Sequence, residues 1–229
     1  MSTAPPSSSH RPGRDPEDDD DLVSYRTLRR VVGLLGVSLP IVLAVWGFAL
    51  EHRVAFLPSI SDYYALRTRD VLVGVLFTIA WFLFTYRGYD RRDEIAGNLA
   101  CVFALGVALF PNVGPWASPA IHFVSAALLF LVLAYFSLFL FTQSAPVCTH
   151  GKVMRNRVYR TCGVAMLVSI VGIALSKAFV SRATLDHWPI IFAFETIALW
   201  AFGYSWFVKG DTVFRDASET APDHSESPA

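Results

Sequence analysis

The stretch PAIHFVSAALLFLVLAYFSLFLF, residues 119–141, decides the fold of this chain, because it runs for 23 residues without an Asp, Glu, Lys or Arg. A helix needs about 20 apolar residues to cross a hydrocarbon core about 30 Å thick. Five other stretches are apolar over comparable or slightly shorter lengths, and they lie at residues 31–50, 71–86, 95–110, 161–180 and 188–208. The sequence therefore predicts an all-α polytopic membrane protein, a bundle of six transmembrane helices.

The composition excludes an ordinary soluble domain, since 54% of the 229 residues are hydrophobic, 18 are Phe, 6 are Trp and only 17% are charged. The two ends differ from the rest. Residues 1–22 are rich in Pro, Ser and Asp, and residues 211–229 are also polar, so neither end can bury enough apolar surface to fold. We expect an acidic disordered tail at 1–22, a six-helix transmembrane domain at 23–210 and a disordered tail at 211–229.

The distribution of Lys and Arg predicts the orientation, because positively charged connections resist translocation. With the N-terminus in the cytoplasm, fourteen of the 19 Lys and Arg residues fall on the cytoplasmic side. An even number of spans places the C-terminus on that side too. We expect a multi-pass protein of the cell membrane with both termini cytoplasmic.

The segment LPSISDYYALRTRD, residues 57–70, is the longest connection on the predicted outer side. Asp70 directly precedes an apolar run, so we expect it to cap the second helix. Ser61 and Asp62 belong to a cluster of turn-forming residues well ahead of that helix, which leaves the carboxylate of Asp62 free to cap a turn or face a pocket. Large apolar side chains lie between these polar groups, and they predict that the segment is ordered and folds against the bundle.

Ionisable residues within the spans are expensive to bury and usually face the interior of a helix bundle. Glu195 lies seven residues into the sixth predicted helix, and Lys177 lies near the outer end of the fifth, where it could pair with Glu195 or extend outward to the head groups. His122 opens the fourth helix with Ser125 on its face, and His187 falls near the outer surface. We expect Asp62, His122 and Glu195 to converge on one polar pocket.

The residues ISD at 60–62 and IHFVSAALLF at 121–130, together with the helix count, resemble the DRAM/Frag/Sfk-type family of six-helix membrane proteins and neighbouring uncharacterised bacterial membrane proteins. By this resemblance Ser61 and Asp62 match the Ile-Ser-Asp element of the family, and His122 matches the histidine that opens its fourth helix. The resemblance implies a role in lipid remodelling, lipid organisation or membrane signalling. The chain departs from the family after Asp62, where YYALRTRD replaces a turn that contains Gly or Pro.

The function that the sequence predicts is binding, sensing or organising a membrane lipid through an outer-leaflet polar pocket. One alternative is an intramembrane metal-dependent lipid hydrolase, similar to the alkaline-ceramidase type, with His122 or His187 paired to Asp62 or Glu195. A proton-coupled transporter titrated at Glu195 is a further alternative. No paired-histidine motif, phosphate-binding loop or nucleic-acid-binding charge pattern occurs in the sequence, so we expect no cofactor, no metal site and no nucleic acid partner. The oligomeric state stays open.

Overall fold

The chain folds as a bundle of long helices, seen here in a computed structural model that describes residues 16–51, 56–88, 90–143 and 150–210. No strand occurs in this described part. A 3-10 helix follows the first long helix, a π-helical turn extends the fourth, and a short helix precedes the last. The elements are α1 (Pro16–Glu51), η1 (Ile60–Ala65), α2 (Arg69–Thr85), α3 (Arg91–Leu109), α4 (Pro119–Tyr135), η2 (Phe136–Leu140), α5 (His150–Phe179), α6 (Arg182–His187) and α7 (Ile190–Lys209).

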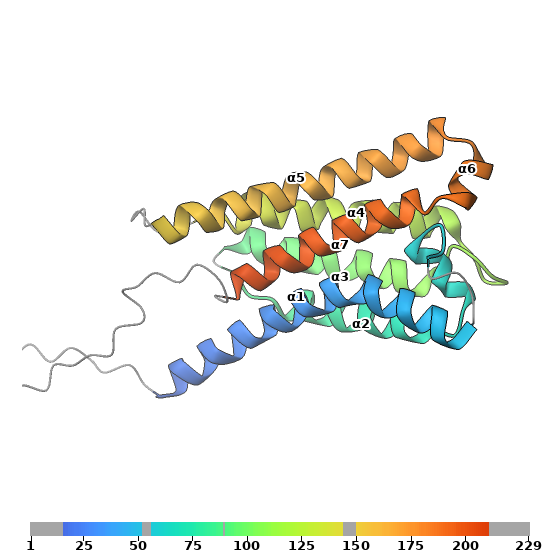
Figure 1. Ribbon diagram of the computed structural model, residues 1–229. Helices are drawn as coiled ribbons and strands as arrows, with labels where there is room; N and C mark the ends of the chain where they lie inside the picture. Colours follow the sequence, from blue (N-terminus) through green and yellow to red (C-terminus); the bar gives the residue numbers. More distant parts are fainter. Residues whose placement is uncertain (1–15, 52–55, 89, 144–149, 211–229) are drawn as a thin grey trace, which may run out of the picture.

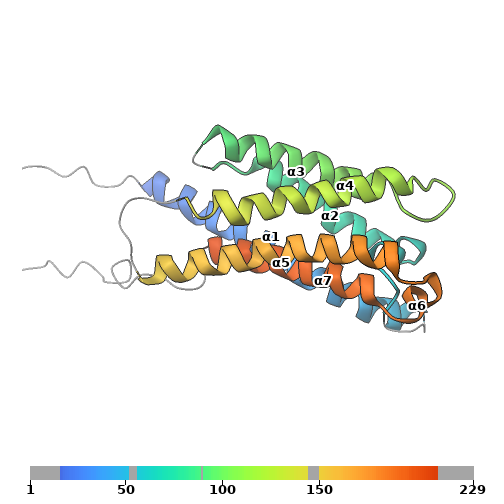
Figure 2. The ribbon, with the colours of Figure 1, turned by 90° about the horizontal axis from the view of Figure 1, so that it is seen from above.

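The six long helices form a closed ring in which α1 packs against α2 and α7, and the order continues α2, α3, α4, α5, α7 (Figures 1 and 2). Neighbours run antiparallel. The start of α1 and the end of α7 lie at one end of the bundle, which we call the terminal end, while η1 and α6 lie together at the other, the η1 end (Figure 1). Segments far apart in the sequence therefore meet at the η1 end.

Helices α1 and α7 approach each other closely at a pair of glycines. A Cβ atom on Gly203 would lie 2.5 Å from the carbonyl oxygen of Gly33, and one on Gly33 would lie 2.6 Å from the carbonyl oxygen of Gly203. A larger residue at either position would force the two backbones apart. Small residues allow such close packing between helices in a membrane, and this contact fixes α7 against α1.

Aromatic rings fill the interior of the bundle toward its terminal end. The ring of Trp206 lies with its centroid 5.1 Å from that of Tyr86, 5.7 Å from that of Phe136 and 5.3 Å from that of Phe141. All four side chains are buried. Aromatic packing of this kind leaves little free space, and both cavities described below lie at the η1 end.

Four helical stretches in the described part are long and apolar enough to cross a membrane, at residues 25–49, 119–140, 150–179 and 190–209. Large apolar side chains also cover the outside of the bundle: 64% of Val45, 58% of Val168 and 56% of Phe139 are exposed. A protein in water rarely exposes apolar surface on this scale. These features are compatible with a helical membrane protein.

The helix ends differ from those expected from the apolar runs. Helix α1 already begins at Pro16, and α5 begins at His150, eleven residues before the predicted start. Lys, Arg and Glu favour helix almost as well as Leu does, so a helix can continue well past its apolar part. The expected acidic tail is thus helical from residue 16, and the parts of the two expected tails at 1–15 and 211–229 lie outside the described residues.

The prediction that Asp70 caps the second helix is wrong. The N-cap position belongs to Thr68, and Asp70 is an exposed residue of the first turn. The helix begins at Arg69, two residues before the apolar run that starts at Val71. A carboxylate in the first turn still interacts favourably with the helix dipole.

Candidate functional site

The segment around η1 is inserted into the η1 end of the bundle. Ile60, Ser61, Tyr63 and Tyr64 are buried, and the backbone N–H of Phe192 on α7 donates a 2.8 Å hydrogen bond to the carbonyl of Pro58. Burying large apolar side chains contributes about 1.5 to 3 kcal/mol each. The expectation that residues 57–70 fold against the bundle is confirmed, while residues 52–55 lie outside the described part.

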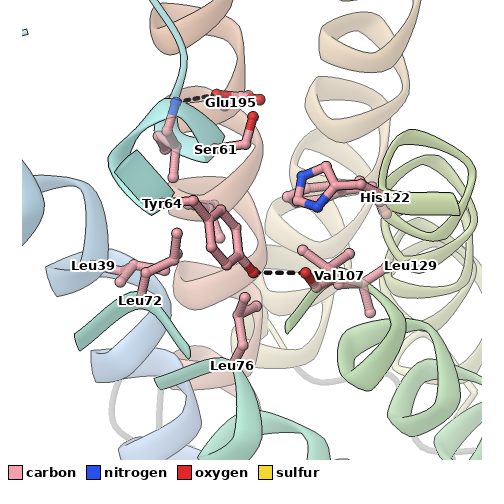
Figure 3. A pocket seen from close by; sticks show the side chains of 13 residues that line it. Leu39, Ser61, Tyr64, Leu72, Leu76, Val107, His122, Leu129 and Glu195 are labelled. Atoms are coloured by element: carbon pink, nitrogen blue, oxygen red, sulfur yellow. Dashed lines mark hydrogen bonds between the residues drawn. The ribbon is translucent and has the colours of Figure 1, made fainter. Parts of the chain in front are cut away.

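Glu195 holds η1 in place from the first turns of α7. Its carboxylate accepts hydrogen bonds from the hydroxyl of Ser59, 3.0 Å from either oxygen, and from the backbone N–H of Ile60 (Figure 3). The hydroxyls of Ser59 and Ser61 lie 2.8 Å apart, and the backbone N–H of Ser61 donates to Ser59 Oγ. One carboxylate therefore anchors the start of η1, and hydrogen bonds to a charged acceptor are stronger than neutral ones.

Beneath η1 lies a small cavity of about 80 Å³, which we call the inner cavity. Figure 3 shows Tyr64 between the leucines of α1 and α2 on one side and His122 on the other. The wall is mostly aliphatic, and the polar or aromatic side chains on it are Ser61, Tyr64, His122, Phe130 and Glu195. The hydroxyl of Tyr64 donates to the carbonyl of Val107 on α3 at 2.6 Å. The inner cavity thus joins η1 to α3, α4 and α7.

His122 is fixed on the wall of the inner cavity by two contacts. Its Nδ1 lies 2.9 Å from the carbonyl oxygen of Phe110, and its ring meets that of Tyr64 edge to face at a centroid distance of 5.6 Å. A hydrogen bond to a carbonyl requires the proton on Nδ1, which leaves Nε2 as an acceptor in the neutral ring. Ser125 is buried one turn further along α4 and lines neither cavity.

A second, larger cavity of about 440 Å³, the outer cavity, shares Ser61 with the inner cavity. Its wall comes from η1 and the segment before it, the loop between α3 and α4, and the ends of α4, α5, α6 and α7. Asn112 links these parts, because its Nδ2 donates to Ser61 Oγ at 3.2 Å and to Asp62 Oδ1 at 3.1 Å. The lining residues are Pro58, Ser59, Ser61, Asp62, Asn112, Phe123, Lys177, Val180, Arg182, Leu185, Asp186 and Ile191.

Charges of both signs line the outer cavity. Lys177 and Arg182 are positive, and Asp62 and Asp186 are negative. In the described part of the chain, no ion pair within 4.0 Å joins any of these four side chains. Instead the ammonium of Lys177 lies 3.4 Å from the ring centroid of Phe123, a cation–π contact. Lys177 therefore forms no ion pair with Glu195, and it is an exposed residue whose ammonium lies over the ring of Phe123.

The electrostatic environment of Asp62 reflects this arrangement. Burial raises the pKa of its carboxyl above the usual value, while the hydrogen bond from Asn112 and the positive charge of Lys177 lower it in part, and the nearby charge of Asp186 raises it. An added cation would favour the ionised carboxylate. Asp62 is therefore a site where a bound positive charge gains stabilisation.

The predicted site residues do not all line one pocket as expected, and they fall into four groups, of which Ser125 and His187, which line neither cavity, form one. His122 and Glu195 line the inner cavity, Asp62 and Lys177 line the outer cavity, and Ser61 lines both. His187 is exposed on α6, where it contacts the ring of Trp188, and lines neither cavity. Sequence reasoning assigned no site role to four residues that shape these cavities, namely Ser59, Asn112, Arg182 and Asp186.

These residues were missed because they stand in short connections, where polar residues are common for solubility and turn formation. For Ser59 a signal was present, since it belongs to the same PSISD turn as Asp62. Arg182 and Asp186 are four residues apart, the spacing that places two side chains on one face of a helix, but a six-residue helix leaves no apolar periodicity to detect.

No group of three or more His, Cys, Asp and Glu side chains in the described part is arranged to hold a metal ion. Comparisons of the chain with protein-family models, with curated proteins and with solved structures found no match. The functional interpretation therefore rests on the two cavities and the charges around them.

Proposed function

We propose that this protein binds a phospholipid of the outer leaflet through the outer cavity, and so senses or organises lipid in the cell membrane. The proposal includes six transmembrane helices with both termini cytoplasmic, which places the η1 end outside. The positive-inside rule supports this orientation, because fourteen of the 19 Lys and Arg residues would then be cytoplasmic. Among the described residues, most Lys and Arg residues lie in the parts of the helices near the terminal end.

Helices α2 and α3 complete the six proposed spans, although they are shorter or less apolar than the other four. Both carry large exposed apolar side chains, since 56% of Trp81 on α2 and 61% of Val102 on α3 are accessible. Such residues suit contact with lipid tails. The charged first turn of α3, with Arg91, Arg92 and Glu94 exposed, would then lie at the cytoplasmic surface.

The main support for the proposal is a large cavity, lined by charged side chains, that lies beside exposed apolar residues at the helix ends. A volume of about 440 Å³ falls within the range of about 300 to 1,000 Å³ that small-molecule sites occupy. Next to it, 41% of Phe123 on α4 and 82% of Phe179 on α5 are exposed. A head group could enter the polar cavity while the acyl chains stay on these apolar surfaces.

The hydrogen bonds of the inner cavity favour binding over hydrolysis. The carboxylate of Glu195 is engaged by Ser59 and Ile60, and Nδ1 of His122 by the carbonyl of Phe110. Among the hydrogen bonds of the described part, none joins Ser61 to His122, as a nucleophile and its base would require. These residues support the fold of η1, which forms the floor of the outer cavity.

Lipid retention by the purified full chain tests the proposal. After mild delipidation in detergent, native mass spectrometry should detect bound phospholipid on the wild type and about two- to fivefold less on Lys177→Gln, the effect of one partly exposed charge contact. Arg157→Gln is the matched control, because it removes a positive charge from an exposed site toward the other end of the same helix. Equal retention by both variants, or none by the wild type, would contradict the proposal.

A further inference from the structure

Two positive and two negative side chains line the outer cavity, and they come from three separate elements. Asp62 belongs to η1, Lys177 to α5, and Arg182 and Asp186 to α6. Arg182 and Asp186 could pair along their helix, yet they lie more than 4.0 Å apart, as do all the opposite charges of this cavity. Unpaired charges that face a common space can each bind a ligand group of the opposite sign.

The cluster is compact enough for its charges to act on one another. Lys177 and Asp186 both influence the ionisation of Asp62, in opposite directions. A ligand with a single negative charge would meet Lys177 and Arg182 favourably but would be repelled by the two carboxylates. A ligand with a single positive charge would be attracted by the two carboxylates and repelled by Lys177 and Arg182. A ligand that carries both charges gains from both pairs, and specificity often depends on such repulsion of the wrong partner.

We propose that the outer cavity selects a zwitterionic phospholipid head group, with its phosphate at Lys177 and Arg182 and its ammonium at Asp62 and Asp186. The inference rests on the lipid-binding function proposed above and names the ligand class. Arg and Lys are the usual protein partners of phosphate.

The cavity wall further favours a primary ammonium, as in phosphatidylethanolamine, over a quaternary one. Quaternary ammonium groups are bound by cages of several aromatic rings. Phe123 is the one aromatic residue of this wall, and Lys177 already occupies the face of its ring. A primary ammonium has three N–H donors instead, and the acceptors around Asp62 include its own carboxylate and the hydroxyl of Ser61, which accepts one hydrogen bond from Asn112 and has a second lone pair.

Competition among lipids with identical acyl chains tests the inference on the delipidated full chain. Equimolar phosphatidylethanolamine, phosphatidylcholine and phosphatidylglycerol are added, and the bound lipid is quantified by native mass spectrometry. The wild type should retain phosphatidylethanolamine preferentially. Asp62→Asn and Asp186→Asn should each reduce its preference over phosphatidylglycerol about two- to fivefold, as expected for one partly exposed ion pair, whereas Arg157→Gln should keep it.

Asp62→Asn is a conservative test, because an asparagine oxygen can still accept the hydrogen bond that Asn112 donates. Equal retention of the three lipids, all weakened by Lys177→Gln, would overturn the inference and leave lipid binding intact. Loss of every lipid from the wild type would overturn both. Soluble phosphoethanolamine serves as a separate arm: if it displaced the lipid at an equal concentration, the ligand would be a free phosphate ester and the lipid assignment would fall.

Discussion

Removing the carboxylate of Glu195 should release η1 locally while the rest of the bundle stays folded. In Glu195→Ala the buried backbone N–H of Ile60 loses its acceptor, whereas Ser59 keeps Ser61 as a partner. A hydrogen bond to a charged group contributes about 1.5 to 3 kcal/mol, so local opening should become about 10- to 150-fold more frequent. Global stability is a poor measure of this effect, because removing a buried charge also removes its desolvation cost.

Hydrogen exchange of a peptide that spans residues 57–66 measures the opening directly. Protection should fall by the stated factor in Glu195→Ala and by less in Glu195→Gln, which retains one acceptor oxygen. Ile197→Ala is the control, because this residue is exposed on the same turns of α7. If the exchange of residues 57–66 were the same in Glu195→Ala as in the wild type, the anchoring role of Glu195 would be refuted.

Three further predictions concern the packing and the charge of the same region. Tyr64→Phe removes the 2.6 Å hydrogen bond to the carbonyl of Val107 and should lower the free energy of unfolding in denaturing detergent by about 1 kcal/mol; an unchanged value would show that this bond adds no stability. Gly203→Ala should cost about 1 to 3 kcal/mol through overpacking against α1, while Gly74→Ala, with open space around it, should cost nothing in the same assay; equal effects would contradict the close contact. Phosphatidylethanolamine retention should fall on acidification at a pH above the usual Asp pKa of about 3.9, because burial raises the pKa of Asp62 and its protonation removes the partner of the ammonium. An acid whose pKa is raised in the folded state stabilises the fold when it is protonated, so the loss of bound lipid on acidification would not reflect unfolding. Asp62→Asn should lack this pH transition, and a transition of equal size in that variant would assign it to another group.

Much of the fold could be predicted from the apolar stretches. Each of the six predicted stretches lies largely within one long helix, and the polar segment at 57–70 forms an inserted connection. The starts of α1 and α5 could not be predicted in this way, because polar residues extend both helices beyond the apolar part. In α5 these include Lys and Arg, which have high helix propensity, and in α1 the first turns hold Glu and Asp, which interact favourably with the helix dipole. The cap was misassigned to Asp70 because hydropathy marks only where the apolar part of a helix begins, whereas the N-cap depends on local backbone geometry.

Several residues of the site could be predicted from the sequence, but their contacts could not. Glu195 within the last apolar stretch, a histidine at the start of α4 and a polar turn at Ser61 and Asp62 were all visible in the sequence. Their partners were not, since Ser59 and Glu195 are 136 positions apart and the rotation of each helix decides which side chains meet. Rotation depends on packing such as the glycine contact between α1 and α7, which no single segment of the sequence specifies.

An experimental density map of the full chain in a bilayer of phosphatidylethanolamine and phosphatidylglycerol would show whether the outer cavity holds a phospholipid head group. We expect head-group density inside the cavity, with the phosphate beside Lys177 and Arg182 and the amine beside Asp62. A well-ordered cavity that contained only water, with all head groups at the level of the surrounding bilayer, would refute the proposed lipid site.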